Sequence, residues 1–578
     1  MTTEKQGLTF NGLAILFAAV LISYLHSYSA PFYLDDYHSI VLNATLQNGL
    51  SNYINSKPSF DRLLTDSLFA INYSISGTAT WSYHAINILI HLFNGILVYT
   101  VTAKLVNAEL EKSDLPLPEW LPIIAALLFC LNPLQSQAIT YIVQRATCLA
   151  TLFYLIGVLA YINWRQSSRI QWLALLGLGI LGGILSKLTI VTLPLSLAIL
   201  ELIFFSKSRK SQYLSISIIA ISIISAVCLI TFPALADKVG GLRGTTAISR
   251  TDYLLSQTQV LWIYIAKFFF PLGLRLEYDF SPVRELDGTT ITAILAHAAL
   301  ITVAMKLRLQ SRLITFGILF YYAAHLPQSS IIPLDDLVFE HRSYLPNFGL
   351  CVAVAGALGL IVERVNKKDL VRNITFALCG VLLILTWQRN QLWRQPVAFY
   401  QDNAEKSPGA WRVWAALAEQ DLQQGKPQKA LETLRKGLTV VRHGKEASSV
   451  EITPEMASQL AKVLVILDHN QEAIDIIDQM LNGGVHIPPY TVANMNYNRG
   501  IAYLKQQQRD MARQNFAEAI NTYPNHLDAI NALAGLELME GKPAQAQPLY
   551  QRILSIDPNN QAAHQGLKMV EQLKGTAK

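Results

Sequence analysis

The chain has 578 residues and a formal net charge of +6, and 52% of its residues are hydrophobic while 15% are charged. The length exceeds that of one ordinary domain, and the averages combine a first part of repeated apolar runs, up to about Trp387, with a polar remainder in which no run could cross a bilayer. A single soluble domain is therefore excluded. The basic residues of the first part lie mostly in short loops, so the net charge predicts no nucleic-acid partner.

The first apolar run, residues 8–25, has the length of a signal-peptide core. No small-residue cleavage site follows it convincingly and later runs resemble it, so we expect a retained membrane helix. The other runs that we expect to cross the membrane are 83–106, 120–134, 143–164, 170–185, 188–205, 213–232, 289–305, 313–326, 345–362 and 371–387. The first part is therefore predicted to be an all-α, polytopic membrane helix bundle.

A twelfth run, residues 260–274, is shorter and contains Lys267 and Pro271. If it does not span and the N-terminus is cytoplasmic, five clusters of basic loop residues fall on the cytoplasmic side, in agreement with the positive-inside rule. If it does span, the last two clusters move outside. We therefore expect eleven spans, with 260–274 in or dipping into the outer interface. This topology puts the loop at 29–40 and the polar C-terminal part on one side, the periplasm of a bacterium or the lumen of the endoplasmic reticulum.

Two adjacent carboxylates, Asp35 and Asp36, follow the first span in the stretch SAPFYLDDYHSI. Acidic residues are common in loops that flank membranes, so this pair alone carries little information. Cations in the outer loops are more informative, because the positive-inside trend should deplete them there. The candidates are Arg62, Arg145, Lys187 and Arg342. Each of these could instead extend its apolar stem along the bilayer edge and merely place its charge at the interface.

Carboxylates and cations at one membrane face suit the transfer of a sugar from a lipid-linked phosphate. The acceptor hydroxyl needs a base to take its proton as it attacks the anomeric carbon. The departing lipid phosphate needs cations to stabilise its growing negative charge. Because the lipid tail stays in the bilayer, the reacting carbon must lie at the interface, where these loops are expected.

Other polar residues of the membrane part could be either functional or structural. Asp335 and Asp336, in PLDDL, could bind substrate or a divalent ion, although paired acids in a loop are more often solvated. His84 and His91, seven residues apart, are expected to be polar core contacts rather than ligands. The five cysteines lie within or beside apolar runs and show no metal-binding spacing. No ligand set is convincing for a metal, and no cofactor is expected to be required.

The polar part, residues 391–578, contains an internal period. Pro524 and Pro558 are 34 residues apart, and so are Ala512 and Ala546. The same pattern, small then large apolar four residues later, recurs at Ala430/Leu434, Ala473/Ile477, Ala512/Phe516 and Ala546/Tyr550. This pattern is similar to tetratricopeptide repeats, and about four repeats cover the chain from Ala410 onward. Such arrays form an α-solenoid that usually binds peptide or protein, although a purely structural cap is the alternative.

The membrane part, residues 1–390, resembles a known superfamily in several blocks that occur in the same order. The blocks are FYLDDYHSIVLN, RLLTDSLFAINYSISGTATWSYHAINILIHLFNGILVY, NPLQSQAITYIVQRATCLATLFYL, LSKLTIVTLPLSLAILEL and IIPLDDLVFEHRSYLPNFG. They resemble the GT-C glycosyltransferases, and in particular the eukaryotic transmembrane, tetratricopeptide-containing O-mannosyltransferases and their bacterial relatives. The resemblance covers nearly the whole chain.

The resemblance implies a polyprenyl- or dolichyl-phosphate sugar donor and an acceptor protein or peptide held by the repeats. By position, Asp35 matches the catalytic base and Asp36 its partner, while Arg145 and Arg342, with His341 and Glu340 beside Arg342, match the charged loop positions that face the donor phosphate. Relatives usually have SKE where this chain has SKL, which makes the role of Lys187 less certain. Some members of the superfamily use a divalent metal.

These features predict an inverting glycosyltransferase that acts on a protein hydroxyl, expected to be Ser or Thr. Two alternatives remain open at this stage. A non-catalytic membrane scaffold that recruits partners through its repeats would leave the charged outer loops unexplained. A lipid or solute transporter should show polar breaks near the midplane of paired helices, whereas here the charge gathers at the outer edge.

Overall fold

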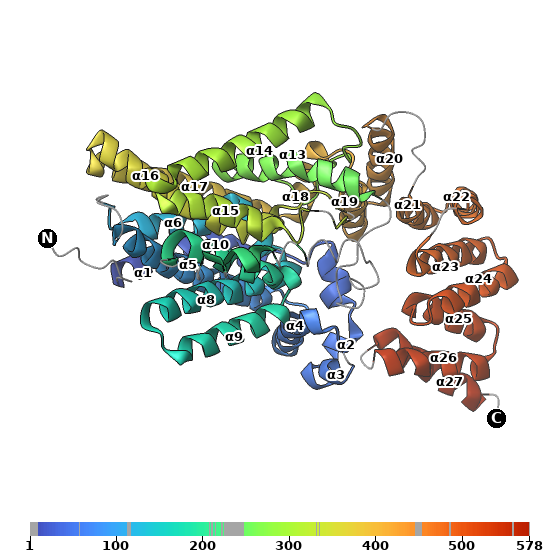
Figure 1. Cartoon of the computed structure of the whole chain (residues 1–578). Coiled ribbons are helices and arrows are strands. Elements are labelled where there is room, and N and C mark those ends of the chain that lie inside the picture. Colours follow the sequence, from blue (N-terminus) through green and yellow to red (C-terminus); the bar gives the residue numbers. More distant parts are fainter. Residues whose placement is uncertain are drawn as a thin grey trace. The chain divides into compact units, whose positions relative to one another are not determined.

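The computed structural model describes residues 10–56, 58–111, 117–206, 209, 212–213, 215–220, 224, 248–330, 332–334, 336–444, 453–484, 487–557 and 560–576. The regular elements of these residues are all helices, as predicted (Figure 1). The chain divides into two compact units, here called the membrane unit, which ends at Phe399, and the repeat unit, which begins at Tyr400. The predicted boundary, between residues 390 and 391, falls within helix α17 (Lys368–Trp393).

Seven described helical segments are long and apolar enough to cross a membrane, or eight if the bent pair Leu121–Leu131 and Pro133–Thr140 forms one span. The seven segments are Phe10–Ser29, Trp81–Leu110, Ile142–Ser167, Leu188–Phe205, Gly288–Leu309, Pro346–Val365 and Lys368–Trp393. These helices indicate an integral membrane protein.

The eleven predicted spans exceed this number for two reasons. The helices α9 (Ile170–Ile184) and α15 (Arg312–His325) have 15 and 14 residues, and at 1.5 Å per residue they reach only about 20 Å of the roughly 30 Å hydrocarbon core. The span predicted at 213–232 lies mostly outside the described residues. The run at 260–274 forms the second half of α13 (Arg250–Phe269), which is not among the candidate spans.

The long helix α5 (Trp81–Leu110) packs against α1 (Phe10–Tyr24), α6 (Leu121–Leu131) and α8 (Arg145–Ser167) and so forms the centre of the membrane unit. Further helices that contribute to this core include α10 (Leu193–Leu200), α14 (Gly288–Lys306) and α16 (Pro346–Val365). α15 and α16 approach closely through Gly317 and Gly349, since a Cβ on Gly317 would lie 2.3 Å from the carbonyl oxygen of Gly349. Small residues at such crossings allow membrane helices to pack without a hydrophobic driving force.

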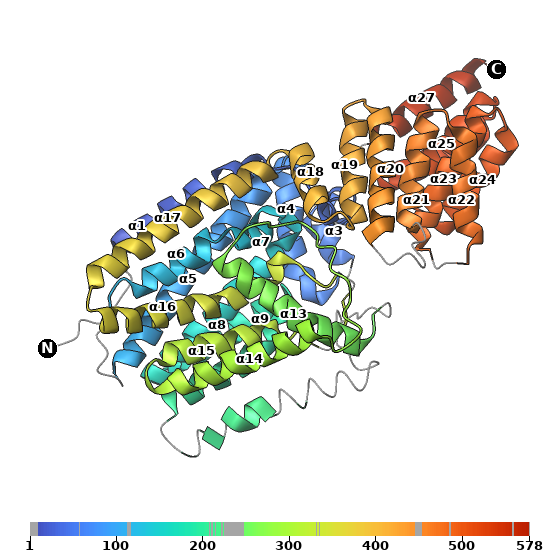
Figure 2. The same ribbon diagram turned by 90° about the horizontal axis from the view of Figure 1, so that it is seen from above.

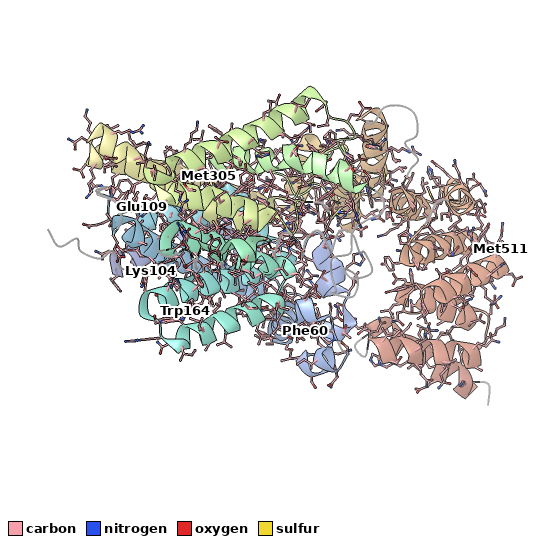
Figure 3. The ribbon with its side chains drawn as sticks, viewed as in Figure 1. Phe60, Lys104, Glu109, Trp164, Met305 and Met511 are labelled. Carbon is pink, nitrogen blue, oxygen red and sulfur yellow. The ribbon has the colours of Figure 1, made fainter. Side chains whose placement is uncertain are left out.

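The loop between α1 and α5 folds into short helices at one end of the membrane unit. They are α2 (Ala44–Gln47), α3 (Leu50–Asn55), the 3₁₀ turn η3 (Phe60–Arg62) and α4 (Leu63–Ser76). In Figure 3, Phe60 lies at this end, whereas Lys104, Glu109 and Trp164 lie at the opposite end. The loops predicted to be outer and inner near these residues therefore occupy opposite ends of the unit.

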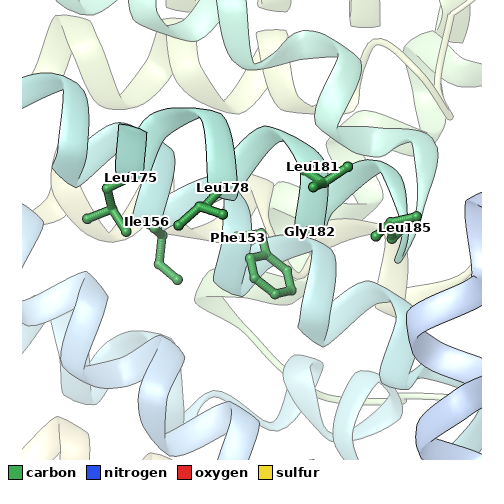
Figure 4. Close-up of a pocket in the computed structure, with 8 residues that line it drawn as sticks. Phe153, Ile156, Leu175, Leu178, Leu181, Gly182 and Leu185 are labelled. Atoms are coloured by element: carbon green, nitrogen blue, oxygen red, sulfur yellow. The ribbon is translucent and has the colours of Figure 1, made fainter. Parts of the chain in front are cut away.

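An apolar pocket of about 390 Å³ lies between α8 and α9 (Figure 4). Phe153, from α8, Leu178, from α9, and Leu185, which directly follows α9, contribute to its wall. Gly182 lets the two helices meet at the Phe153 ring, because a Cβ at Gly182 would lie 2.4 Å from a ring carbon. The pocket has the apolar lining that an alkyl or isoprenoid chain needs, and Leu185 precedes Lys187 by two residues.

The repeat unit consists of antiparallel helix pairs that stack side by side (Figure 2). The pairs are α19 (Trp411–Gln423) with α20 (Pro427–Gly444), α21 (Pro454–Ile466) with α22 (Asn470–Asn482), α23 (Pro489–Lys505) with α24 (Arg509–Thr522) and α25 (Leu527–Met539) with α26 (Pro543–Ile556), followed by α27 (Gln561–Thr576). The predicted small positions Ala430, Ala473, Ala512 and Ala546 are all fully buried. The predicted repeat pattern therefore corresponds to the observed helix crossings.

Candidate functional site

Asp36 is a buried carboxylate that joins the first loop to the segment before α8. Its Oδ2 accepts the backbone N–H of Tyr33 at 2.9 Å, and its Oδ1 accepts the backbone N–H of Val143 at 2.7 Å. Burial raises the pKa of Asp36 to about 8, against the lowering effect of these hydrogen bonds, and the charge of Asp35 adds to the rise. Asp36 therefore favours its protonated form near neutral pH.

Asp35 differs from its neighbour because its side chain is partly exposed. Its backbone N–H donates to the hydroxyl of Tyr141 at 2.8 Å, and burial together with the charge of Asp35 raises the pKa of Tyr141 well above its usual value. The residue before it, Leu34, has a φ of +26°, a value that L-residues rarely adopt. Backbone strain of this kind persists only where the surroundings impose it, and it is concentrated at functional sites.

Three of the four candidate cations gather in one place. Lys187 precedes the 3₁₀ turn η6 (Leu188–Thr192) and donates to the hydroxyl of Thr147, in the first turn of α8, at 2.9 Å. Burial, together with the charges of Arg62 and Arg342, lowers the pKa of Lys187 to about 7. Arg342 lies in the 3₁₀ turn η9 (Glu340–Ser343) and is 8% exposed. A cluster of like charges of this kind suits an anion, which would relieve the mutual repulsion.

The fourth cation, Arg145, is fully buried and has protein partners on all sides. It donates to the side-chain oxygens of Asn87 at 2.7 Å and Asn72 at 2.6 Å, and to the carbonyl oxygen of Tyr83 at 3.0 Å. Its guanidinium also lies 4.4 Å from the centre of the Phe69 ring. These contacts favour a role for Arg145 in positioning α4, α5 and α8 over direct contact with a donor phosphate.

Glu340 and His341 are buried in the same turn as Arg342. The Oε1 of Glu340 accepts the backbone N–H of Arg275 at 2.5 Å and the hydroxyl of Tyr278 at 2.8 Å. Burial raises the pKa of Glu340, while the charge of Arg389 lowers it. The backbone N–H of His341 donates to the side-chain oxygen of Gln137 at 2.8 Å, and burial lowers the pKa of this histidine well below its usual value.

The two remaining predicted acids belong to the PLDDL stretch. Asp336 is exposed, and Asp335 lies outside the described residues. Among the residues that the structure describes, no three His, Cys, Asp or Glu side chains gather in a way that could hold a metal ion.

Sequence reasoning missed the aromatic residues that link these groups. Trp393, at the end of α17, stacks on Tyr141 with ring centres 6.2 Å apart, and Tyr33 packs edge-on against Trp393 at 5.1 Å. The guanidinium of Arg389, one turn earlier, lies 5.8 Å from the Trp393 ring centre. The sequence signal for these residues is the WQRN and LWR stretches at the end of the last apolar run. This signal is weak, because aromatic and basic residues at the end of a span also serve as ordinary membrane-edge anchors.

Comparison with known proteins identifies two kinds of relative. A model of the tetratricopeptide repeat matches residues 503–569. The protein O-mannosyl-transferase F38B6.6 of Caenorhabditis elegans is 24% identical over 429 residues, which are 70% of this chain and 59% of the relative. The protein O-mannosyl-transferase TMTC4 of Homo sapiens is 22% identical over 460 residues, which are 68% of this chain and 61% of the relative. The chain is a distant homologue of the TMTC proteins.

The similarity to the TMTC proteins is partial. The chain spans about three fifths of the length of the two relatives named above. Among solved structures, the tetratricopeptide protein TTC0263 of Thermus thermophilus aligns with this chain at 16% identity and a TM-score of 0.26. The alignment covers 33% of this chain and 95% of the TTC0263 chain. This last match is too weak to add to the description of the repeat unit.

Proposed function

We propose that the chain is a membrane glycosyltransferase that moves a sugar from a polyprenyl-phosphate (or dolichyl-phosphate) donor to a hydroxyl of an acceptor protein. The observation that supports this most is the segment at 141–147. Tyr141 and Val143 hold the loop of Asp35 and Asp36, and Thr147, four residues beyond Val143, accepts the hydrogen bond from Lys187. One short segment thus ties the carboxylate pair to the cation cluster, as a reaction between a hydroxyl and a lipid phosphate requires.

In the proposed reaction, Asp35 accepts the proton of the acceptor hydroxyl as that oxygen attacks the anomeric carbon of the sugar. The new carbon–oxygen bond forms while the bond to the phosphate oxygen breaks, so a single displacement inverts the anomeric centre. The electron pair leaves with the polyprenyl phosphate. Arg62, Lys187 and Arg342 stabilise the charge that develops there.

Asp36 has a supporting role in this proposal. Its two oxygens accept hydrogen bonds from the backbone N–H groups of Tyr33 and Val143. When Asp36 is protonated, it carries no negative charge that would repel the carboxylate of Asp35. The charges of Lys187 and Arg342 act on His341, which is proposed to lie beside the donor phosphate, while the apolar pocket between α8 and α9 is suited to the polyprenyl chain. We propose that Asp336, together with Asp335, contributes to binding the acceptor.

The repeat unit is proposed to bind the acceptor protein on the periplasmic or lumenal side of the membrane. Deleting residues from Ala410 onward should reduce modification of the natural protein acceptor more than transfer to a short soluble peptide, because a tethered acceptor has a higher effective concentration. Equal losses on both acceptors would make the repeats a stabilising cap.

The decisive test is single-turnover sugar transfer by Asp35→Asn in the purified full chain. The change keeps the shape of the side chain and removes its basicity, so turnover should fall by roughly 10²-fold or more while donor affinity stays nearly unchanged. Asp369→Asn is the matched control, because the Asp369 side chain is 78% exposed and pairs only at the surface with Arg372. Full activity of Asp35→Asn would reject this carboxylate as the base.

A further inference from the structure

Glu340 and three other buried side chains carry polar atoms that have no hydrogen-bond partner among the described residues. Both polar atoms of the Gln135 carboxamide are in this state, and so are the Ser136 hydroxyl, the Oε2 of Glu340 and the indole N–H of Trp393. Gln135, Ser136 and Trp393 are fully buried, and Glu340 is 1% exposed. An unpaired buried polar group costs about 1–3 kcal/mol, so several together in one place call for an explanation.

These side chains come from segments that pack on one another. Gln135 belongs to the 3₁₀ turn η4 (Pro133–Gln135), which contacts both η9 and α17, and Ser136 begins α7 (Ser136–Thr140), which contacts them as well. The hydrogen bond from the His341 backbone to the side chain of Gln137 fixes this arrangement at 2.8 Å. The charge of Arg389 acts on Glu340, although burial outweighs it and raises the Glu340 pKa, and the same guanidinium lies 5.8 Å from the centre of the Trp393 ring.

The chemistry of the unpaired atoms selects a class of ligand. A carboxamide offers donor and acceptor together, a carboxylate oxygen accepts, an indole N–H donates, and a hydroxyl does both. A phosphate would be repelled by Glu340, and an indole N–H or a carboxamide N–H cannot coordinate a metal ion. A ring that carries several hydroxyls, each both donor and acceptor, could satisfy all of these groups at once.

We propose that Gln135, Ser136, Glu340 and Trp393 form the site that binds the hydroxyls of the donor sugar. This inference rests on the proposed function and names the sugar-recognition residues within it. The position agrees with the chemistry, because Trp393 stacks on Tyr141, whose hydroxyl holds the backbone of Asp35, and Arg342 of the cation cluster follows Glu340 by two residues. The sugar would thus lie between the base and the cations.

Equilibrium binding to the full chain in lipid nanodiscs tests this proposal without relying on turnover. The probes are polyprenyl phosphate alone and polyprenyl phosphate carrying mannose, glucose or N-acetylglucosamine. We expect at least one sugar form to bind more tightly than polyprenyl phosphate. Gln135→Leu should weaken that form by about tenfold or more and leave polyprenyl phosphate within about twofold, since only the sugar loses its partners.

Glu340→Gln keeps the shape of its side chain and provides a second variant in case Gln135→Leu does not fold. Gln259→Leu is the matched control, because the Gln259 carboxamide bonds to Thr290 at 2.9 Å between α13 and α14, away from η4 and η9. An equal loss for all probes in both variants, or no added affinity from any sugar in the unmodified chain, would overturn the proposal. If the unmodified chain bound no probe at all, the proposed function itself would fail, and this inference with it.

Discussion

Two sets of charged side chains, one from the membrane unit and one from the repeat unit, differ in their exposure to solvent. In the membrane unit, Asp36 and Arg145 are fully buried, and their partners are backbone groups and amide side chains from distant segments. In the repeat unit, ion pairs such as Arg435 with Glu472 at 3.0 Å lie on the surface, with side chains 54% and 45% exposed. The two sets therefore differ in what surrounds the charged group, which is protein in the membrane unit and water in the repeat unit.

The physical reason is the solvent that each group would otherwise have. A surface pair exchanges well-solvated charges for a screened contact and contributes about 0–1 kcal/mol. A buried charge has given up its hydration, so the groups that surround it cannot be removed without leaving polar atoms unpaired. The following predictions test this contrast, from the largest expected effect to the smallest.

Arg145→Leu should cause the largest loss. The change removes the donors that Asn72, Asn87 and the Tyr83 carbonyl now share, and unpaired buried acceptors cost about 3 kcal/mol or more in total. We expect a clear fall in thermal stability of the purified protein in detergent. Arg169→Leu, at an exposed position after α8, is the control and should change stability little. Unchanged stability of Arg145→Leu, together with weaker donor binding, would instead make Arg145 a phosphate ligand.

Asp36 should give the membrane unit a pH-dependent stability. Its pKa is raised from 3.8 to about 8 in the folded protein, chiefly by burial, so the folded state holds a proton that the unfolded chain releases. Its contribution is therefore fully present below about pH 4 and is lost as pH rises towards about 8, by up to about 1.4 kcal/mol per pH unit. Unfolding of the wild type and of Asp36→Asn should be compared across this range. If the free energy of unfolding changed with pH equally in both proteins, Asp36 would not be the titrating group.

Lys187 should make donor binding weaker at high pH. Its pKa, lowered to about 7 by burial and then by Arg62 and Arg342, should rise again when a phosphate lies beside it. Affinity for a glycosylated polyprenyl phosphate, whose phosphodiester charge is constant, should fall by about tenfold or more from about pH 6.5 to about pH 8.5. Lys187→Arg keeps its charge over this range and should bind independently of pH. The same decline in both proteins would place the titrating group elsewhere.

Arg435→Ala should have the smallest effect. The pair with Glu472 is exposed and screened, so the free energy of unfolding of the repeat unit should change by less than about 1 kcal/mol. Thermal unfolding at low and high salt measures this. A loss as large as that of Arg145→Leu would show that the contrast between the units is not one of solvation.

Several features could be predicted from the sequence because each depends on neighbours along the chain. Apolar runs long enough to cross a bilayer identify the membrane helices, and the 34-residue spacing of Ala512 and Ala546 identifies the repeats, since both follow from helix length and period. Within the described residues, fewer helices are long enough to span than predicted, because hydropathy alone does not reveal that α9 and α15 are short. The candidate carboxylates and cations were likewise visible as residues at the predicted outer edge.

The sequence by itself thus determined the kinds of helix, their order and the pool of charged residues from which a site could be drawn. Only the tertiary structure decided how each of them is used. Asp36 is buried because Val143, 107 residues away, supplies its N–H, and Arg145 is enclosed by residues 58 to 73 positions earlier in the chain. Gln135 lies near the turn that contains Glu340 only because η4 packs against η9. Solvation and hydrogen bonding of a side chain depend on segments distant in sequence, so the fold assigns roles that residue type and spacing leave open.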